Sequence, residues 1–274
     1  MKVKPIKSVA IVSKNTDKFA SKFSIKIAKT FETYGISAHL VAPLRSKKFN
    51  RIDSIADLKK ERIDALIVVG GDGTILKSAR QINDETPILG INVGGTGLMA
   101  EISPDDVDEA IKRLKRKKYF IDRRIRIHAS SSSQTFPPAL NEIYSGKVTG
   151  IRTPIYLIEV GLGGRLMQKM DGLIISTPTG STGHSLSLGS PIIVDQMDVM
   201  LITPIASISR MPPIVTPMFE ITVTSSMKSS IIIDGQIAVK VDADEPIRIS
   251  RHKSRTSFIR FSTSQLRQLI RFGF

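Results

Sequence analysis

The chain has 274 residues, of which 41% are hydrophobic, with no cysteine and a formal net charge of +15. This length allows one large or two ordinary domains, and the lack of cysteine excludes disulfides, thiolate metal sites and a cysteine nucleophile. No apolar run approaches the roughly 20 residues that span a bilayer, and the first residues lack the apolar segment of a signal peptide. We therefore expect a globular cytoplasmic protein without a membrane partner.

The positive charge favours polyanionic partners. Lysine and arginine outnumber the acidic residues 40 to 25, which suits nucleic acids, acidic membranes or polyphosphorylated metabolites. The densest basic run, residues 112–118, follows an acidic stretch at 105–109, as in a helix whose charges complement its own dipole. Aromatic residues make up only 5% of the chain and tryptophan is absent, so bases would find few stacking surfaces. A nucleic-acid partner is therefore not expected.

Strand and helix patterns alternate over residues 1–120. Apolar runs predict strands, and apolar residues near helical spacing predict helices. The predicted strands are 8–12, 36–41, 65–69 and 87–92, and the predicted helices are 17–34, 74–82 and 105–117. This alternation predicts an open parallel sheet with right-handed crossovers, in an α/β domain over 1–120.

From residue 121 the pattern changes to short apolar or alternating runs broken by serine, glycine and proline. The runs that predict strands are 124–129, 155–160, 173–176, 199–202, 219–224, 231–233 and 246–249. Many short strands without helices predict a β-rich, sandwich-like domain over 121–258, with a loop at 130–134. A segment over 259–274, with an amphipathic helix at 264–271, is expected to pack back on the first domain.

The most informative stretch is Gly70-Gly-Asp-Gly-Thr74, which directly follows the buried strand 65–69 and opens a helix. Backbone N–H groups and the helix dipole favour anions at such a place, and glycines let a phosphate approach closely. Asp72 would repel phosphate unless it handles a proton or a metal ion, which points to phosphoryl transfer. The alternative is that Asp72 only caps the helix.

No nucleotide-binding fingerprint of the usual kinds accompanies this loop. It lacks a Walker lysine, and no G-x-G-x-x-G follows the first strand. Lys77, one turn into the helix, would lie near a bound phosphate or would simply face solvent. The four histidines are scattered and predict no metal site.

A second informative segment runs from Asp171 to Pro191, where a buried strand leads into a dense run of hydroxyls and glycines. Such a run suits hydrogen bonds to a nucleotide, and the alternative is a flexible loop. The bracketing prolines, Pro178 and Pro191, favour a shaped segment. His184 has no acid at an obvious spacing to orient it, so we interpret it as a pocket wall.

Three further polar positions are weaker candidates. Asn141-Glu142 precedes a strand-like pair, and an amide beside a carboxylate can grip sugar hydroxyls or can form an ordinary polar bend. Arg152 and Lys169 are ordinary surface residues unless a phosphate lies nearby.

Taken together and in this order, these motifs closely resemble the NAD kinase family. The resemblance rests on Gly70–Thr74, Asn141-Glu142 and residues 171–182, and extends to Asn92-Val-Gly-Gly-Thr-Gly97, 203–207 and Ile233-Asp-Gly-Gln236. It spans roughly residues 65 to 240. The hydroxyl-rich motif is highly specific, whereas Gly-Gly-Asp-Gly-Thr is shared with lipid kinases and more loosely with phosphofructokinases.

The resemblance implies phosphorylation of the adenosine-ribose 2′-hydroxyl of NAD, with ligand between an α/β domain and a β-rich domain. It implies ATP or polyphosphate as donor, Mg²⁺ or another divalent cation held mainly by the phosphates, and a homodimer or homotetramer. Asp72 would accept or orient the hydroxyl proton, while the amides of the glycine loop would hold the donor phosphates.

The resemblance also carries ligand-binding roles to other positions. Asn141 and Glu142 would contact the adenosine ribose, and Gly71, Gly73 and Thr74 the donor. Those around the adenine and nicotinamide would be Asp171, Thr182, Gly183, Ser187 and Ala206. Further ligand contacts would come from Lys77, Asn92, Arg152, Lys169, Thr179, His184 and Gln236.

Three departures from the family pattern fall at specificity positions. Gly183-His184 stands where the family often has Ala-Tyr, Leu98-Met99 replaces a frequent aromatic pair, and residues 206–212 lack a histidine found in many members. They bear on the choice between NAD and NADH. A lipid kinase, a non-catalytic dinucleotide-binding sensor and a basic nucleic-acid binder are the alternative functions.

Overall fold

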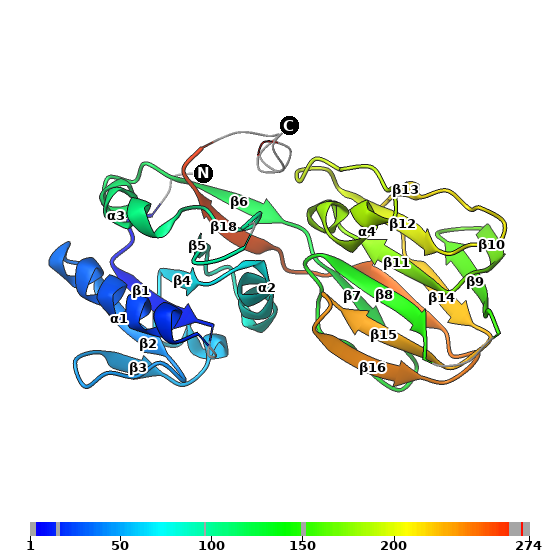
Figure 1. Ribbon diagram of the computed structural model, residues 1–274, viewed down its shortest axis with the longest axis horizontal. Coiled ribbons are helices and arrows are strands. Elements are labelled where there is room, and N and C mark those ends of the chain that lie inside the picture. Colours follow the sequence, from blue (N-terminus) through cyan, green and yellow to red (C-terminus); the bar gives the residue numbers. More distant parts are fainter. Residues whose placement is uncertain (1–3, 15–16, 96, 149–151, 263–269, 271–274) are drawn as a thin grey trace. The chain divides into compact units, whose positions relative to one another are not determined.

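The computed structural model describes residues 4–14, 17–95, 97–148, 152–262 and 270 (Figure 1). The chain divides into two compact units, one formed by 1–123 together with 256–274 and the other by 124–255. The helix predicted over 264–271 lies outside the described residues, except for Ile270. No helix in the described parts of the chain is long and apolar enough to cross a membrane.

A seven-stranded sheet organises the first unit, in the order β3-β2-β1-β4-β5-β18-β6. Its strands are β1 (Ser8–Ser13), β2 (Ser37–Val41), β3 (Asn50–Ile52), β4 (Ala65–Val69), β5 (Ile88–Ile91), β6 (Phe120–Arg124) and β18 (Thr256–Arg260). The neighbours from β3 to β18 pair in parallel. The predicted parallel α/β domain is therefore confirmed.

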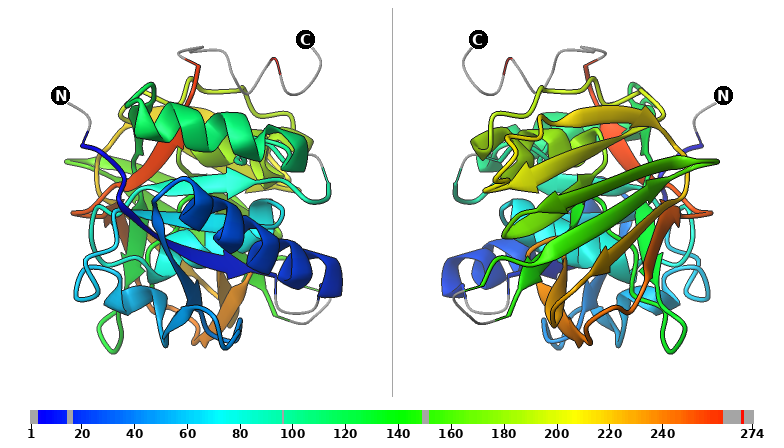
Figure 2. Two further views of the ribbon diagram at one scale, coloured as in Figure 1. Left: turned by 90° about the vertical axis from the view of Figure 1, so that its left-hand side faces the viewer. Right: turned by 90° about the vertical axis from the view of Figure 1, so that its right-hand side faces the viewer.

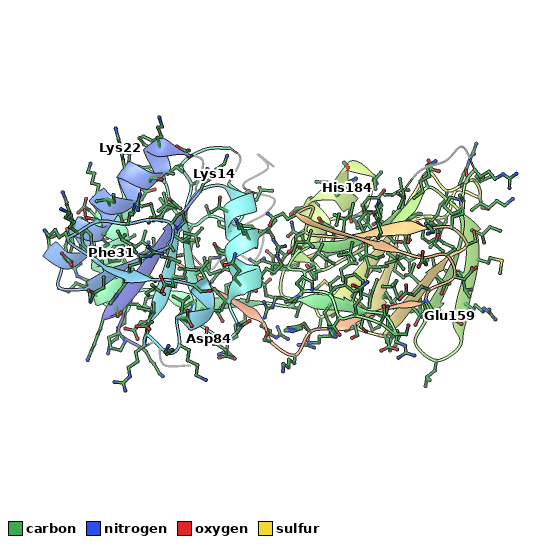
Figure 3. All side chains as sticks on the ribbon, turned by 90° about the horizontal axis from the view of Figure 1, so that it is seen from below. Lys14, Lys22, Phe31, Asp84, Glu159 and His184 are labelled. Carbon is green, nitrogen blue, oxygen red and sulfur yellow. The ribbon has the colours of Figure 1, made fainter. Side chains whose placement is uncertain are left out.

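Helices cover both faces of this sheet. Helices α1 (Lys18–Thr33) and α3 (Val107–Lys115) lie on one face and α2 (Asp72–Gln81) on the other (Figures 1 and 2). Asp17 caps α1 by accepting hydrogen bonds from the amides of Phe19 and Ala20. Phe31 is buried in the core beside the sheet, whereas Lys22 points away from it (Figure 3). Because all five residues of β4 are buried, its continuous apolar run is explained.

Two helices begin differently from the prediction. Helix α2 starts at Asp72 rather than Thr74, because Gly71 is the extended N-cap and its carbonyl accepts hydrogen bonds from the amides of Thr74 and Ile75 at 2.9 and 3.2 Å. The helix predicted over 105–117 starts as a 3₁₀ turn at Pro104–Asp106 and continues as α3. The first of these shifts brings Asp72 and Gly73 into the first helical turn.

The second unit is a sandwich of two antiparallel sheets, with strand orders β10-β9-β14-β17-β7 and β13-β12-β11-β8-β15-β16. The first sheet contains β7 (Ile127–Ser130), β9 (Ile155–Val160), β10 (Gly164–Lys169), β14 (Ile221–Ser225) and β17 (Ile247–Arg251). The second contains β8 (Glu142–Lys147), β11 (Gly172–Ser176), β12 (Val199–Ile205), β13 (Ile214–Pro217), β15 (Ser229–Ile233) and β16 (Ile237–Val241). One apolar core joins Tyr156 and Ile158 of the first sheet to Ile143 and Ile231 of the second. The predicted sandwich-like fold is confirmed.

Candidate active site

A cavity of about 800 Å³ opens at the carboxyl ends of β1, β2, β4 and β5 in the first unit. Its lining includes Val12, Ser13, Lys14, Asp17, Val41, Ala42, Asp53, Ser54, Ile55, Gly70, Gly71, Gly73, Thr74, Lys77, Ser78, Gln81, Val93, Gly94 and Gly95. Ligands of open parallel sheets bind at this edge. The structure therefore gathers the predicted donor-binding residues of the first glycine loop, together with Lys77, around one cavity.

Two glycines of the loop at residues 70–74, Gly70 and Gly71, lie in close packing. A Cβ atom on Gly70 would lie 2.6 Å from the Thr74 hydroxyl oxygen, and one on Gly71 would lie 3.2 Å from the carbonyl oxygen of Gly94. The N–H groups of the first turn of α2 have no partners within the helix, and they point out of the helix end that borders the cavity. This wall of the cavity is therefore suited to an anion.

Asp72 does not cap α2. Its two carboxylate oxygens accept hydrogen bonds from the backbone amides of Leu98 and Met99, at 3.0 and 2.9 Å respectively. These bonds tie the start of α2 to the two residues that directly follow Gly97, and they fix the direction of the carboxylate. An ionised carboxylate has about four acceptor positions, so each oxygen keeps capacity for a proton or a cation.

Asn92 shapes the second glycine loop, residues 94–97. Its side-chain nitrogen donates to the carbonyl of Gly95 at 3.1 Å, and its oxygen accepts from the amide of Gly94 at 3.2 Å. Gly97 has a φ of +64°, and a Cβ atom there would collide with the Asn92 amide. Asn92, predicted to bind ligand, therefore binds the loop that lines the cavity.

In the second unit, Asn141 and Glu142 carry unused acceptor atoms. Oδ1 of Asn141 and Oε2 of Glu142 are buried and have no hydrogen-bond partner in the described part of the chain. Burial raises the pKa of Glu142 to about 8, and the negative charge of Asp234 adds to this effect. Buried acceptors without partners are costly, so these two atoms mark a place for a ligand with hydrogen-bond donors.

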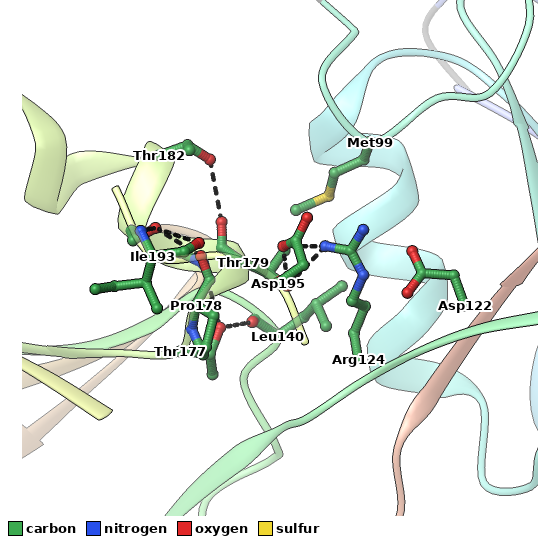
Figure 4. Close-up of polar contacts among 12 residues, drawn as sticks. Met99, Asp122, Arg124, Leu140, Thr177, Pro178, Thr179, Thr182, Ile193 and Asp195 are labelled. Carbon is green, nitrogen blue, oxygen red and sulfur yellow. Dashed lines mark hydrogen bonds and ion pairs between the residues drawn. The ribbon is translucent and has the colours of Figure 1, made fainter. Parts of the chain in front are cut away.

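The hydroxyl-rich segment is shaped by its own hydrogen bonds. It forms a 3₁₀ turn, η3 (Thr179–Thr182), followed by the short helix α4 (His184–Ser187). The hydroxyl of Thr182 donates to the carbonyl of Thr179 at 3.1 Å, and that of Thr179 donates to Asp195 at 3.3 Å (Figure 4). Arg124 forms a buried ion pair with Asp195 and also donates to the Thr179 hydroxyl at 3.3 Å. The flexible-loop alternative is therefore wrong.

Gly183 brings this segment against the Asn141–Glu142 pair. A Cβ atom at position 183 would lie 3.3 Å from Oε2 of Glu142 and 3.2 Å from the carbonyl oxygen of Gly180. Both distances are tighter than ordinary contact, so an alanine here would press on the Glu142 carboxyl group. The departure from the family pattern at this position leaves space beside an unpartnered acceptor.

An aromatic platform that the sequence analysis missed lies beside these residues. The ring of Tyr144 covers two glycines, Gly146 and Gly172, where a Cβ atom would collide with it. His184, which we interpreted from the sequence as a pocket wall, contacts the ring of Tyr144 edge to face. The centroids of the two rings are 5.8 Å apart. Gly146 and Gly172 pair with one another across β8 and β11. Two glycines at paired positions in a sheet leave room for a ring to lie over them, and this was the feature of the sequence that could have indicated the aromatic platform.

Asp171 lies on the same side of the second unit. It pairs with Lys147 at 2.7 Å, a residue that sequence reasoning also missed, and both side chains are about one-third exposed, at 37% and 31% respectively. Asp171 adds to the effect of burial in raising the pKa of Tyr144, while Lys147 opposes it. The tyrosine, the acid and the lysine therefore form one polar and aromatic group.

The remaining predicted residues, other than Asp171, are exposed. Lys169, Asp171 and Ala206 are brought together through backbone bonds, because the amide of Asp171 donates to Ile205 at 2.9 Å and that of Ile208 to Lys169 at 3.0 Å. Ser187 donates its hydroxyl to the carbonyl of His184 at 2.7 Å. The other exposed positions are Arg152, in the segment between β8 and β9, and Gln236, in the turn between β15 and β16.

Comparisons with known proteins identify the relatives of this chain. The family model of the ATP-NAD kinase N-terminal domain matches residues 4–119, and that of the ATP-NAD kinase C-terminal domain matches residues 140–261. An NAD kinase of Thermococcus sibiricus is 34% identical over 219 residues, 77% of this chain and 78% of the relative. An NAD kinase of Geotalea daltonii is 31% identical over 279 residues, 97% of each chain.

A solved structure shares the fold. The crystal structure of an NAD kinase from Archaeoglobus fulgidus in complex with ATP superposes with a TM-score of 0.78 at 28% identity, covering 97% of both chains. Two family models thus account for most of the chain, and a relative of 31% identity covers 97% of it. The chain therefore belongs to the NAD kinase family.

Proposed function

We propose that this protein transfers the γ-phosphoryl group of ATP to the adenosine-ribose 2′-hydroxyl of NAD, giving NADP and ADP. The observation that carries the proposal is a carboxylate, Asp72, that two backbone amides fix at the helix end bordering a cavity of about 800 Å³. A binding protein that only held phosphate would gain nothing from a negative charge at this place, which argues against the non-catalytic sensor.

The cavity favours a nucleotide over polyphosphate as the donor. Its glycine wall and Lys77 suit the phosphate groups, because amides and a lysine supply donors and positive charge. Its lining also includes Val12, Val41 and Ile55, whose apolar side chains suit the face of a base. A linear polyphosphate would need cationic side chains along its whole length, so ATP is the better match.

Asp72 performs the proton transfer in the proposed reaction. As the 2′-oxygen attacks the γ-phosphorus, its proton passes to the Asp72 carboxylate and the new oxygen–phosphorus bond forms. The bond between the γ-phosphorus and its bridging oxygen breaks, and ADP leaves with that electron pair. Catalysis of this kind depends mainly on positioning and on neutralising charge. The hydrogen bonds from Leu98 and Met99 supply the positioning of the base.

A divalent cation fits the donor site. The described residues contain no cluster of three or more histidine or acidic side chains that could hold a metal ion alone, so the ion would be bound mainly by the donor phosphates. The free lone pairs of Asp72, between the lining residues Gly71 and Gly73, offer it a protein ligand. When bound, the cation would neutralise negative charge on the transferred group.

The second unit would hold NAD. Asn141 and Glu142 would receive hydrogen bonds from the adenosine-ribose hydroxyls, since their buried oxygens lack donors. Tyr144 with His184 would contact an aromatic ring of the dinucleotide, and Asp171 would contact its polar edge. Thr179 and Thr182 would act through the shape of η3, because their hydroxyls are bonded within the unit.

We also propose a cytoplasmic homo-oligomer, with no nucleic-acid or membrane partner. Strand β10 is an edge strand, and Leu162, Met167 and Phe219 on or beside β10, β9 and β14 are exposed. Exposed apolar side chains at a sheet edge favour self-association. Light scattering on the purified protein would show a dimer or tetramer, and a monomer at micromolar concentration would contradict this part of the proposal.

Asp72→Asn tests the central step. The amide side chain keeps the size of Asp72 but is a poor base, so we expect NADP formation to fall by about 10²–10⁴, while NAD binding measured by calorimetry stays near that of the wild type. Asp105→Asn, an exposed acid beside α3, is the matched control and should leave turnover unchanged. Wild-type turnover by Asp72→Asn would exclude the proton transfer.

A further inference from the structure

One carboxylate binds three consecutive backbone amides at the Asn141–Glu142 pair. Oδ1 of Asp234 accepts hydrogen bonds from the amides of Asn141 and Glu142, at 2.8 and 3.3 Å, and Oδ2 accepts one from the amide of Leu140 at 3.2 Å. Asp234 is only 5% exposed, and its φ is +48°, a conformation that non-glycine residues adopt rarely. This one buried carboxylate therefore bonds all three amides at once.

The carbonyl groups of the same three residues also have partners. Thr177 donates its hydroxyl to the Leu140 carbonyl at 2.6 Å (Figure 4) and its amide to the Asn141 carbonyl at 2.9 Å. The amide of Asp234 donates to the Glu142 carbonyl at 3.0 Å. Every backbone N–H and C=O group of residues 140–142 is therefore bonded to Asp234 or Thr177.

The side chains contrast with this backbone. Oδ1 of Asn141 and Oε2 of Glu142 are the buried atoms of the pair without partners. A backbone that is bonded at all its polar groups has one orientation, so it directs both acceptors to one fixed place. We propose that Asp234 is a positioning residue for NAD, which aligns Asn141 and Glu142 with the vicinal hydroxyls of the ribose. This inference rests on the proposed function.

Asp234 also influences the charge of Glu142. Its negative charge and burial together raise the pKa of Glu142 to about 8, so the Glu142 side chain is a neutral acid at pH 7. A neutral carboxyl group can donate one hydrogen bond and accept others, which matches a hydroxyl that does both. The position of Asp234 thus affects both the geometry and the protonation of the ribose site.

Asp234 is the charged side chain that acts on the pKa of Glu142. On β11 the partner of Glu142 across the sheet is Ser176, and η3 contains only threonine, glycine and serine. Asp234 itself interacts with Arg126, whose pKa burial lowers and Asp234 raises. A titration of Glu142 that affects NAD binding would therefore respond to Asp234.

The test compares Asp234→Asn with the wild type in steady-state kinetics and in NAD calorimetry. An asparagine side chain has one acceptor atom and no charge, so it cannot bind all three amides. We expect KM and Kd for NAD to rise about tenfold or more, with kcat and KM for ATP nearly unchanged. The inflection in the pH dependence of KM for NAD should move to lower pH.

Thr177→Val supplies a second, uncharged change at the same segment. It removes the hydroxyl that bonds Leu140 but leaves Asp234 in place, so KM for NAD should rise without a shift of the pH inflection. Thr177→Ser keeps the hydroxyl and should restore wild-type KM. Asp242→Asn, at an exposed ion pair with Lys228, is the matched control in the same unit and should change nothing.

The outcomes separate the possible failures. A folded Asp234→Asn variant with wild-type KM, Kd and pH profile would overturn the proposal. If Asp234→Asn does not fold, Thr177→Val provides the test. An unchanged KM and Kd for NAD in Thr177→Val would also overturn the proposal. A wild-type protein that binds NAD but makes no NADP would refute the proposed function, whereas the calorimetric comparison would still test the role of Asp234.

Discussion

The two regions of this protein that we propose to bind ligands are built in opposite ways. In the first unit, glycines and helix amides surround an open cavity, and the fixed side chain is Asp72. In the second unit, buried side chains bond one another, and the unpartnered atoms of Asn141 and Glu142 are what remains for a ligand. Every phosphoryl donor presents the same phosphate groups, so backbone amides are sufficient to bind it in the first unit. The ribose of NAD presents several similar hydroxyls, so side chains held in fixed positions are needed in the second unit to select one of them.

The largest effect on stability should come from the interior of the second unit. Arg124 and Asp195 form an ion pair with side chains only 5% and 3% exposed. Because Arg124→Met leaves Asp195 charged and buried, it should lower the free energy of unfolding by about 3–5 kcal/mol. Urea denaturation would measure it. The double change to Arg124→Met and Asp195→Leu should recover much of the loss, and a single variant as stable as the wild type would contradict this reading.

A smaller and pH-dependent effect should come from Glu142. Its pKa is about 8 in the folded protein against 4.5 as the ordinary value, so the folded state holds a proton that the unfolded state has lost. Stability should therefore be full below pH 4.5 and fall as the pH rises to about 8, on the order of a few kcal/mol in total. Glu142→Gln should flatten that part of the curve.

Thermal unfolding of wild type and Glu142→Gln across pH 5 to 8.5 would show this difference. The glutamine variant should gain stability over the wild type at the alkaline end and match it more closely at the acid end. Parallel curves for the two proteins would show that Glu142 does not carry the proton.

The smallest effect should come from the open cavity of the first unit. Lys77 lines it and is exposed, so Lys77→Ala should raise KM for ATP by about tenfold while KM for NAD stays the same. Steady-state kinetics at two salt concentrations would check it, since screening should weaken the lysine contribution. Lys22→Ala on α1 is the control and should change neither KM value. An equal rise of KM for ATP and KM for NAD in Lys77→Ala would contradict the separation of the two regions.

The sequence predicted elements best where apolar residues follow a clear strand pattern, either continuous as in β4 or alternating as in β9. Strand β4 and strand β9 have the predicted bounds, 65–69 and 155–160, since their apolar residues follow the strand pattern. Strand β10 was missed because it is an edge strand whose side chains are mostly exposed. Strand β18 is buried, but no local pattern indicates that it joins the sheet of the first unit.

For the site, the sequence indicated the motifs but not their contacts. Asp72 was found from its glycines, yet its bonds to Leu98 and Met99 depend on a loop from another strand. Asp234 lies in a segment that resembled the family, but its three bonds join positions more than 90 residues apart. Such partners follow from the folding of two strands side by side and have no local signature.

The position of β18 bears on the order in which the protein folds during synthesis. In the sheet of the first unit, β18 lies between β5 and β6, and its Phe258 pairs with Ile88 of β5. Strand β6 is synthesised long before β18. During synthesis on the ribosome, β6 therefore has no neighbouring strand β18 to pair with until the whole second unit has emerged. The sandwich, whose strands all lie within 124–255, can close first, and the domain that carries Asp72 is completed last.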